Sequence, residues 1–127
     1  MTAPFFSVII PVYNRAGPLG RAIESVLAQS CQDFEIVVVD DGSTDAPHTV
    51  VQRFADPRIR FIRQDNAGGG AARNAAIDAA RGRFVAPLDS DDIFLPHHLE
   101  RMRALLEGSD GTLVGYARIR VDRGAGR

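Results

Sequence analysis

Lysine is absent from this 127-residue sequence, and cysteine occurs only once, at Cys31. All 15 basic residues are arginines, so the chain has no lysine for a Walker-type phosphate loop or for Schiff-base catalysis. A single cysteine cannot form an internal disulfide, which is typical of a protein from a reducing compartment. We expect Cys31 to pack at a helix end rather than to react.

The chain also lacks an excess of charge of one sign and a long hydrophobic run. Its net charge is -1, so no broad basic field is present, and we expect no nucleic-acid partner. The apolar run Phe5–Val12 has no preceding basic region and is too short to span a bilayer. We therefore expect no targeting segment. No internal repeat is apparent, and the length suits one domain with a real core.

Apolar runs alternate with segments of helical spacing. Nearly continuous apolar runs predict strands that are covered on both faces. Strands that alternate with helices predict an α/β fold, with a doubly wound, mainly parallel sheet and helices on both faces. The expected strands are Phe6–Val12, Phe34–Val39, Arg60–Arg63 (half-exposed), Phe84–Leu88 and Thr112–Ala117. The expected helices contain Leu19 to Leu27, Pro47–Phe54 (capped by Asp45), Gly70–Ala80, and a segment opened by Pro96.

A polar cluster follows each of the first four expected strands, at residues 13–15, 40–45, 65–74 and 89–92. Ligands of such sheets bind beyond the carboxyl ends of the strands. Each cluster has an ordinary structural interpretation: Asp-Gly-Ser is common in turns, and three glycines form a flexible turn. The glycines can also present backbone N–H groups to an anion. Four such clusters on one edge favour a binding site.

The acidic residues Asp89, Asp91 and Asp92 lie within four positions of each other, directly after an apolar strand. Like charges placed so closely raise each other's energy unless a positive group lies between them. Oxygen ligands on a short turn suit Mg²⁺ or Mn²⁺, which usually bridges to substrate phosphates. The alternative is a solvated acidic turn before a helix. We expect His97 and His98 to lie on the exposed side of that helix start, not to bind metal.

Five segments of the chain carry motifs in a fixed order: residues 7–14, 24–29, 39–45, 72–74 and 88–92. In this order they resemble family 2 glycosyltransferases of the GT-A fold, and the similarity extends from about Phe6 to Tyr116. The resemblance implies a Rossmann-like GT-A fold and a nucleotide-diphosphate-sugar donor, usually a UDP-sugar. It further implies a Mn²⁺ or Mg²⁺ cofactor and inverting transfer to an acceptor that is a saccharide or lipid-linked.

The resemblance also implies roles for residues of the nucleotide site. Pro11 and Tyr13 line the base pocket, with the tyrosine ring against the nucleobase. Asp41 accepts a hydrogen bond from a ring N–H of the base, and Asp40 supports that loop. Arg73 approaches the donor phosphates or orders the neighbouring loop.

The DXD position of the family is matched by Asp89, Ser90 and Asp91. By resemblance, Asp91 holds the metal, while Asp89 and Ser90 face the ribose or the waters of the metal, so both Asp91 and Asp89 are candidate metal residues. Asp92 is expected at the start of the following helix, where a negative charge is favourable to the helix dipole.

Family members are longer than this chain, and their acceptor half supplies the catalytic carboxylate. We therefore expect residues 1–127 to form the nucleotide-sugar-binding half of an incomplete GT-A domain, with the base beyond residue 127 and little activity alone. Exposed apolar area would then favour self-association. The expected location is cytoplasmic, or the cytoplasmic face of the membrane for a full-length enzyme.

Two other classes of protein fit part of the pattern. A response-regulator receiver has a similar length and alternation, but it needs its acidic pair after the first strand and a lysine near the fifth. Here Asp40 and Asp41 follow the second expected strand, and lysine is absent. A non-catalytic nucleotide-sugar-binding module would keep the same donor loops.

Overall fold

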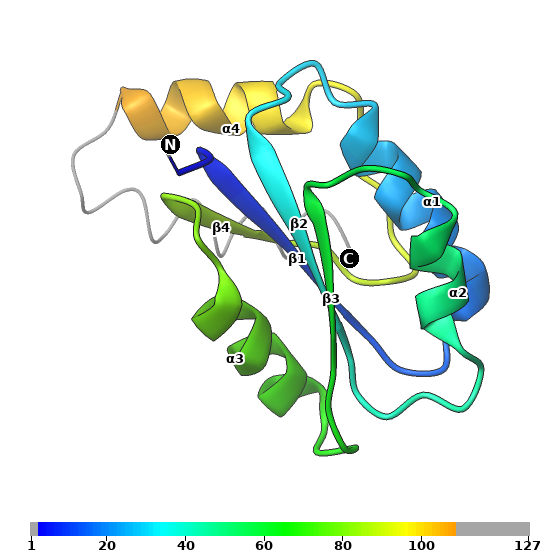
Figure 1. Cartoon of the computed structure of the whole chain (residues 1–127). Helices are drawn as coiled ribbons and strands as arrows, with labels where there is room; N and C mark the ends of the chain where they lie inside the picture. Colours follow the sequence, from blue (N-terminus) through cyan, green and yellow to red (C-terminus); the bar gives the residue numbers. More distant parts are fainter. Residues whose placement is uncertain (1–2, 109–127) are drawn as a thin grey trace.

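The structure is a computed structural model that describes residues 3–108. Four parallel strands form one sheet in the order β3-β2-β1-β4, with helices on both faces (Figure 1). This arrangement confirms the expected doubly wound α/β fold. The strands are β1 (Phe6–Val12), β2 (Phe34–Asp40), β3 (Ile59–Arg63) and β4 (Phe84–Pro87), and the helices are α1 (Ala16–Leu27), α2 (Pro47–Gln52), α3 (Gly69–Ala79) and α4 (His98–Glu107).

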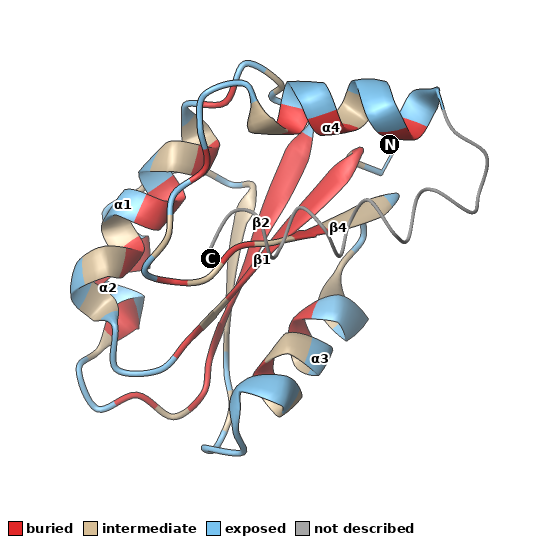
Figure 2. Cartoon of the chain, turned by 180° about the vertical axis from the view of Figure 1, so that it is seen from behind, coloured by how far each residue is buried: buried red, intermediate tan, exposed pale blue. Residues whose placement is uncertain are grey.

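Strands β1 and β2 form the centre of the sheet and are almost fully buried (Figure 2). Alternate side chains point to opposite faces, so each strand contributes to two cores. Val8 and Ile10 face the larger core, to which α1, α2 and α4 contribute, whereas Ile9 faces a smaller core under α3. Burying each such side chain is worth about 1.5–3 kcal/mol, and this explains the continuous apolar runs.

Helix α3 packs on β1 and β2 through the small side chains of Ala72 and Ala76. Alanine methyl groups let the helix axis lie close to the sheet, as its small-residue composition predicts. The helix begins directly after Gly68, whose φ of 99° favours glycine. Its first turn is therefore held beside the carboxyl ends of β1 and β2.

The structure corrects the expected role of Asp45. Its carboxylate does not cap α2; Oδ2 accepts a hydrogen bond from the backbone N–H of Ala16, the first residue of α1, at 2.9 Å. Helix α2 instead follows Ala46, which has a left-handed φ of 58° and makes no side-chain cap bond. The loops after β1 and β2 leave the sheet side by side. The Asp45 carboxylate can therefore reach the backbone N–H groups in the first turn of α1.

The expected roles of Asp92 and His98 are also wrong. Asp92 lies in the loop before α4, six residues ahead of the first helical residue, because Pro96 occupies a turn before the helix rather than opening it. His98 is partly buried, and its ring stacks on Phe94 with centroids 4.3 Å apart. Burial lowers the pKa of its imidazole. Tertiary packing of the loop against α4 therefore decides both positions.

Strand β3 and Cys31 lie at the periphery of the sheet and of the larger core. Strand β3 is half-exposed at the sheet edge, as its alternation predicts, and Cys31 packs partly buried against the larger core just after α1. The expected strand Thr112–Ala117 lies outside the described residues. Within residues 3–108, none of the helices combines the length and apolar character needed to cross a membrane.

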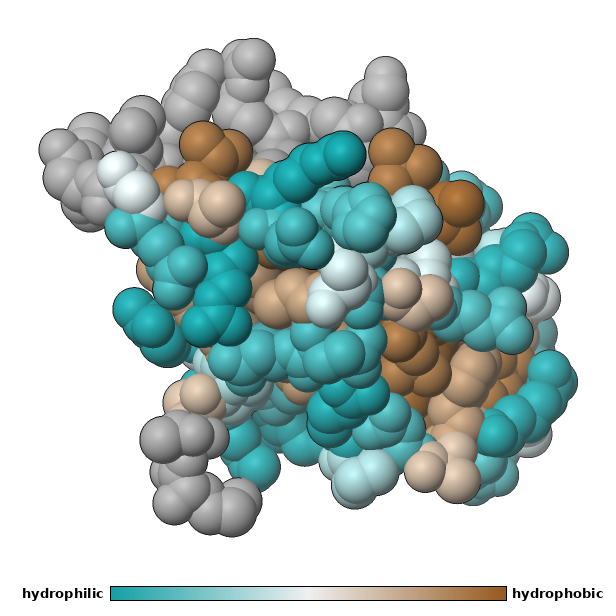
Figure 3. All heavy atoms as spheres, turned by 90° about the horizontal axis from the view of Figure 1, so that it is seen from above, coloured by the Kyte–Doolittle hydropathy of each residue, from teal (hydrophilic) through white to brown (hydrophobic). Residues whose placement is uncertain are grey.

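Among residues 3–108, a few large apolar side chains are exposed at the surface. Ile93, Leu95 and Leu105 are more than half exposed. On the face shown in Figure 3, hydrophobic areas are interspersed among hydrophilic residues. Scattered apolar side chains are normal on protein surfaces and do not by themselves mark an interface. The expected self-association therefore stays a prediction.

A buried polar network at the start of β2 fastens the segment between α3 and β4 to the sheet. The Glu35 carboxylate accepts hydrogen bonds from the Ser7 hydroxyl, the Arg60 guanidinium (2.8 Å) and the Arg81 backbone N–H (2.6 Å). Ser7 in turn accepts a bond from the Gly82 N–H at 2.8 Å. A Cβ at Gly82 would lie 2.7 Å from the β1 backbone, so this close approach requires glycine.

Replacing the carboxylate in Glu35→Gln should lower the free energy of unfolding by about 2 kcal/mol, because buried donors lose a charged acceptor. Urea denaturation measures the change. Glu24→Gln, which removes the same charge from the exposed face of α1, is the matched control and should change stability by less than about 0.5 kcal/mol. Equal midpoints for the two variants would contradict a structural role for this network.

The same network predicts a dependence of stability on pH. Burial alone raises the pKa of Glu35, but hydrogen bonds from Ser7, Arg81 and Arg60 outweigh it and hold the pKa below its ordinary value. A carboxyl with a lowered pKa contributes stability above its ordinary pKa and loses it as the pH falls through the folded-state value. The stability difference between wild type and Glu35→Gln should therefore shrink in acid. A difference that stays constant from pH 7 to strongly acidic conditions would refute this.

Candidate functional site

A cavity of about 570 Å³ opens beyond the carboxyl ends of β1 and β2, beside the first turn of α3. Parallel strands end at the same edge, so their following loops converge there. Five of the eight residues expected in the nucleotide and metal site line it, together with the glycines at positions 68–70; they are Pro11, Tyr13, Asp41, Arg73 and Asp89. The other three are not in its lining: Asp40 is the last residue of β2, and Ser90 and Asp91 lie in the loop after β4.

Tyr13 provides an aromatic surface at the mouth of the cavity. Tyr13 is 51% exposed although it directly follows the buried strand β1. Pro11, two positions earlier on the same side of β1, also lines the cavity. A half-exposed aromatic ring beside a cavity is suited to stacking on a planar ligand.

The buried Asp41 carboxylate holds the loop that covers one side of the cavity. It accepts hydrogen bonds from the side-chain amides of Gln64 (2.9 Å) and Asn66 (3.2 Å), and from the backbone N–H groups of Ala67 (2.8 Å) and Gly68 (3.0 Å). The Gln64 bond is the main influence that holds the pKa of Asp41 below its ordinary value, and the two backbone bonds add to it against the effect of burial. Asp41 is therefore an anion at neutral pH that protein donors surround.

Gly42 allows the two loops to meet at this point. Its φ is 78°, a conformation that favours glycine, and a Cβ there would lie 2.8 Å from the backbone nitrogen of Asn66. The Asp-Gly pair is therefore required by both the turn and the close approach of the neighbouring loop.

Asp40 is fully buried at the end of β2 and stabilises the turn that follows. Its Oδ1 accepts a bond from the Ser43 N–H at 2.9 Å, and its Oδ2 pairs with the Arg63 guanidinium at 2.7 Å. Asp40 thus supports this turn through its hydrogen bonds, and its part in a nucleotide site stays a prediction. Its carboxylate lies beneath the loop rather than in the cavity lining.

The loop between β1 and α1 is fixed to the loop after β2. The Asn14 N–H donates to the Ser43 hydroxyl at 2.9 Å, and the Asn14 side-chain oxygen accepts from the Thr44 N–H at 2.8 Å. Asn14 adopts a left-handed φ of 51°, which asparagine tolerates better than most residues. The sequence places Asn14 in a polar cluster but indicates no role for its side chain. It likewise indicates no role for the side chains of Gln64 and Asn66.

Arg73 extends from α3 toward the acidic loop. Its Nη2 lies 3.9 Å from Asp89 Oδ1, while its buried Nε has no hydrogen-bond partner among the residues that the structure describes. A buried donor without an acceptor is unfavourable by about 1–3 kcal/mol, and a guanidinium is well shaped to bind phosphate. The arrangement fits an anionic ligand in the cavity.

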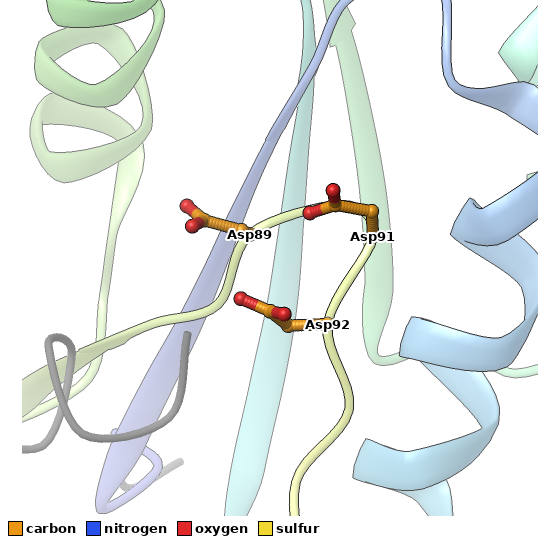
Figure 4. A group of neighbouring side chains, drawn as sticks. All are labelled: Asp89, Asp91 and Asp92. Carbon is orange, nitrogen blue, oxygen red and sulfur yellow. The ribbon is translucent and has the colours of Figure 1, made fainter. Parts of the chain in front are cut away.

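The three acids of the loop after β4 form one group. One carboxylate oxygen from each of Asp89, Asp91 and Asp92 lies within 4.8 Å of the other two, and Figure 4 shows the three side chains on the loop after β4. Asp92 is thus part of the same acidic group as Asp89 and Asp91. Ser90, which lies between Asp89 and Asp91 in the sequence, is buried. Arg15 pairs with Asp91 at 2.8 Å. A set of carboxylate oxygens is the donor set that Mg²⁺ and Mn²⁺ prefer, so the group fits such a cation.

Comparison with known sequences gives consistent matches. The sequence profile of "Glycosyl transferase family 2" matches residues 7–127. The succinoglycan biosynthesis protein ExoO of Rhizobium meliloti (strain 1021) is 47% identical over 120 residues, which are 94% of this chain and 33% of that protein. The putative glycosyltransferase EpsH of Bacillus subtilis (strain 168) is 38% identical over 92% of this chain and 35% of its own length. The chain spans about a third of these relatives.

Solved structures with similar folds include nucleotide complexes. S. aureus TarS 1-349 in complex with UDP superimposes with a TM-score of 0.75 and 33% identity, covering 80% of this chain and 32% of that one. The mannosyltransferase PcManGT from Pyrobaculum calidifontis, in complex with GDP-Man and Mn²⁺, gives a TM-score of 0.77 and 28% identity, covering 88% and 34%. The fold of this chain is therefore that of GT-A enzymes.

Asp41→Ala should release the loop that its carboxylate holds. Hydrogen exchange at the amides of Ala67 and Gly68 should become at least about tenfold faster, because both lose their acceptor. NMR-detected exchange measures this directly. Asp65→Ala removes an exposed carboxylate from the same loop and is the control. Unchanged protection of both amides in Asp41→Ala would show that other contacts hold the loop.

Proposed function

The chain belongs to glycosyl transferase family 2, and from this premise we propose that it binds a nucleotide-diphosphate-sugar, preferably a UDP-sugar, as the donor for glycosyl transfer. The observation that carries the proposal is one cavity lined by a ring for stacking, a buried carboxylate acceptor, a guanidinium N–H without a partner among the described residues, and Asp89, which belongs to the group of three acids. These are the groups needed for a base, a diphosphate and a cation.

For the base, the proposal assigns Tyr13 as the stacking surface, with Pro11 beside it, and Asp41 as the acceptor for a ring N–H. Four protein donors already surround Asp41, so the base has to replace one of them. The side-chain amides of Gln64 and Asn66 are the candidates, because a side chain rotates without moving the backbone. Of these two bonds, the one from Asn66 is longer, at 3.2 Å.

For the diphosphate, the proposal assigns Arg73, whose buried Nε lacks a partner among the described side chains. Asp91 and Asp89 would hold Mn²⁺ or Mg²⁺, with Asp92 beside them, and Ser90 and Asp89 would face the ribose or the waters of the metal. A cation there neutralises the diphosphate and stabilises the charge that develops as the diphosphate leaves. TarS with UDP and PcManGT with GDP-Man and Mn²⁺ support this choice of ligands.

The proposal extends to the domain and the reaction. Residues 1–127 would form the nucleotide-sugar-binding part of a GT-A domain, which is consistent with matches that cover about a third of the relatives. The reaction would proceed with inversion onto a saccharide or lipid-linked acceptor. No catalytic base is assigned among residues 3–108, where the acids of the site already have roles in loop support or in the acidic group.

UDP binding should depend on the cation. We expect Mn²⁺ to tighten UDP binding at least about tenfold over EDTA, because a divalent ion offsets the charge between the acids and the diphosphate. Asp91→Asn should abolish this gain, whereas Asp78→Asn on the exposed side of α3 should preserve it. Calorimetry measures both. The same UDP affinity in EDTA and in Mn²⁺ would reject the cation site.

Base selectivity should depend on Asp41. UDP and TDP present a ring N–H and should bind at least about tenfold better than ADP, a discrimination that one well-made hydrogen bond provides. GDP also has a ring N–H and is the main rival. Asp41→Ala should reduce the difference in affinity between UDP and ADP. Asn66→Ala loosens the same loop but keeps the Asp41 carboxylate, so it should retain this difference in affinity. Competition assays that rank ADP equal to UDP would contradict the assignment.

A further inference from the structure

Arg15 forms an ion pair that joins two loops far apart in the sequence. Its Nη1 lies 2.8 Å from Asp91 Oδ2, across 76 positions of chain. The side chains are about half exposed, at 54% and 45%. The pair connects the loop that leads into α1 with the acidic loop after β4.

The backbone on both sides of Arg15 is held by the loop after β2. Its neighbour Asn14 is bonded to Ser43 and Thr44, and its other neighbour Ala16 donates to Asp45 at 2.9 Å. These bonds fix both flanking residues to the loop after β2. The long guanidinium arm is therefore the part that can change position, by rotation of its side chain alone.

Arg15 and a divalent cation would compete for the Asp91 carboxylate. Asp91 contributes one of the three carboxylates that lie within 4.8 Å of one another, and its Oδ2 accepts the Arg15 bond. A carboxylate has a limited number of lone pairs, and a cation in the group would repel a guanidinium directly beside it. Since half-exposed ion pairs are weak, a divalent ion can displace this one.

We propose that Arg15 is the counter-ion of Asp91 and that a divalent cation displaces it, so that Arg15 lowers the cation affinity of the acidic group. Arg15 is in this sense a positioning residue. It offsets the repulsion among Asp89, Asp91 and Asp92 when no cation is bound, and its guanidinium moves away from Asp91 when the cation binds. The inference rests on the proposed function only in taking Asp89, Asp91 and Asp92 as the cation site.

The experiment is a titration of Mn²⁺ alone, without nucleotide, in which electron paramagnetic resonance counts the free aqueous ion. Arg15→Gln should bind Mn²⁺ about fivefold more tightly than wild type at low salt, because the competing charge is removed. Arg15→Lys keeps a positive charge and should lie closer to wild type. Arg21→Gln removes one charge from the exposed face of α1 and should change the affinity less than about twofold.

The outcomes separate this inference from the proposed function. Weaker or unchanged Mn²⁺ binding in Arg15→Gln, an equal gain in Arg21→Gln, or no Mn²⁺ binding by any variant would overturn the counter-ion role. A tighter Arg15→Gln variant would support it whether or not UDP binds. Failure of UDP to bind in a separate titration would reject the donor assignment alone.

Discussion

The parallel pairing of β1 with β2 is the constraint on which the site depends. Its register places Val12 beside Asp40, so both strands end at one level and their loops leave the sheet side by side. The bonds of Asn14 to Ser43 and Thr44 follow from this adjacency. Burial of both strands on both faces makes a shift of register costly, because it would move apolar side chains between the two cores.

The acids of the site divide into two kinds by their partners. Asp40 and Asp41 are buried, and their charges stabilise loops through backbone and side-chain donors of the protein itself. Asp91 is about half exposed and pairs with Arg15, whose side chain is also about half exposed. A carboxylate surrounded by internal donors gives shape to a cavity, whereas one with a weak, exposed partner can exchange it for a ligand.

Local expectations failed where a side chain had a choice of partners. Asp45 could reach the start of α1 or of α2, and only the adjacency of two loops decides for α1. The positions expected for Asp92 and His98 depend on their distance from an expected helix start. The turn at Pro96 and the stacking of His98 on Phe94 place them differently. Helix starts predicted from proline and polar residues are uncertain by a few positions for this reason.

The sequence by itself determined the order of strands and helices, the two buried central strands and the polar clusters at their ends, because periodicity and apolar runs are local properties. It also contained the motif order that indicates the family. Only the tertiary structure decided that four donors surround Asp41, that Arg73 Nε lacks a partner among the described residues, and that Arg15 pairs with Asp91. Such contacts join residues 23 to 76 positions apart, and the relative placement of loops, which no local pattern encodes, selects them.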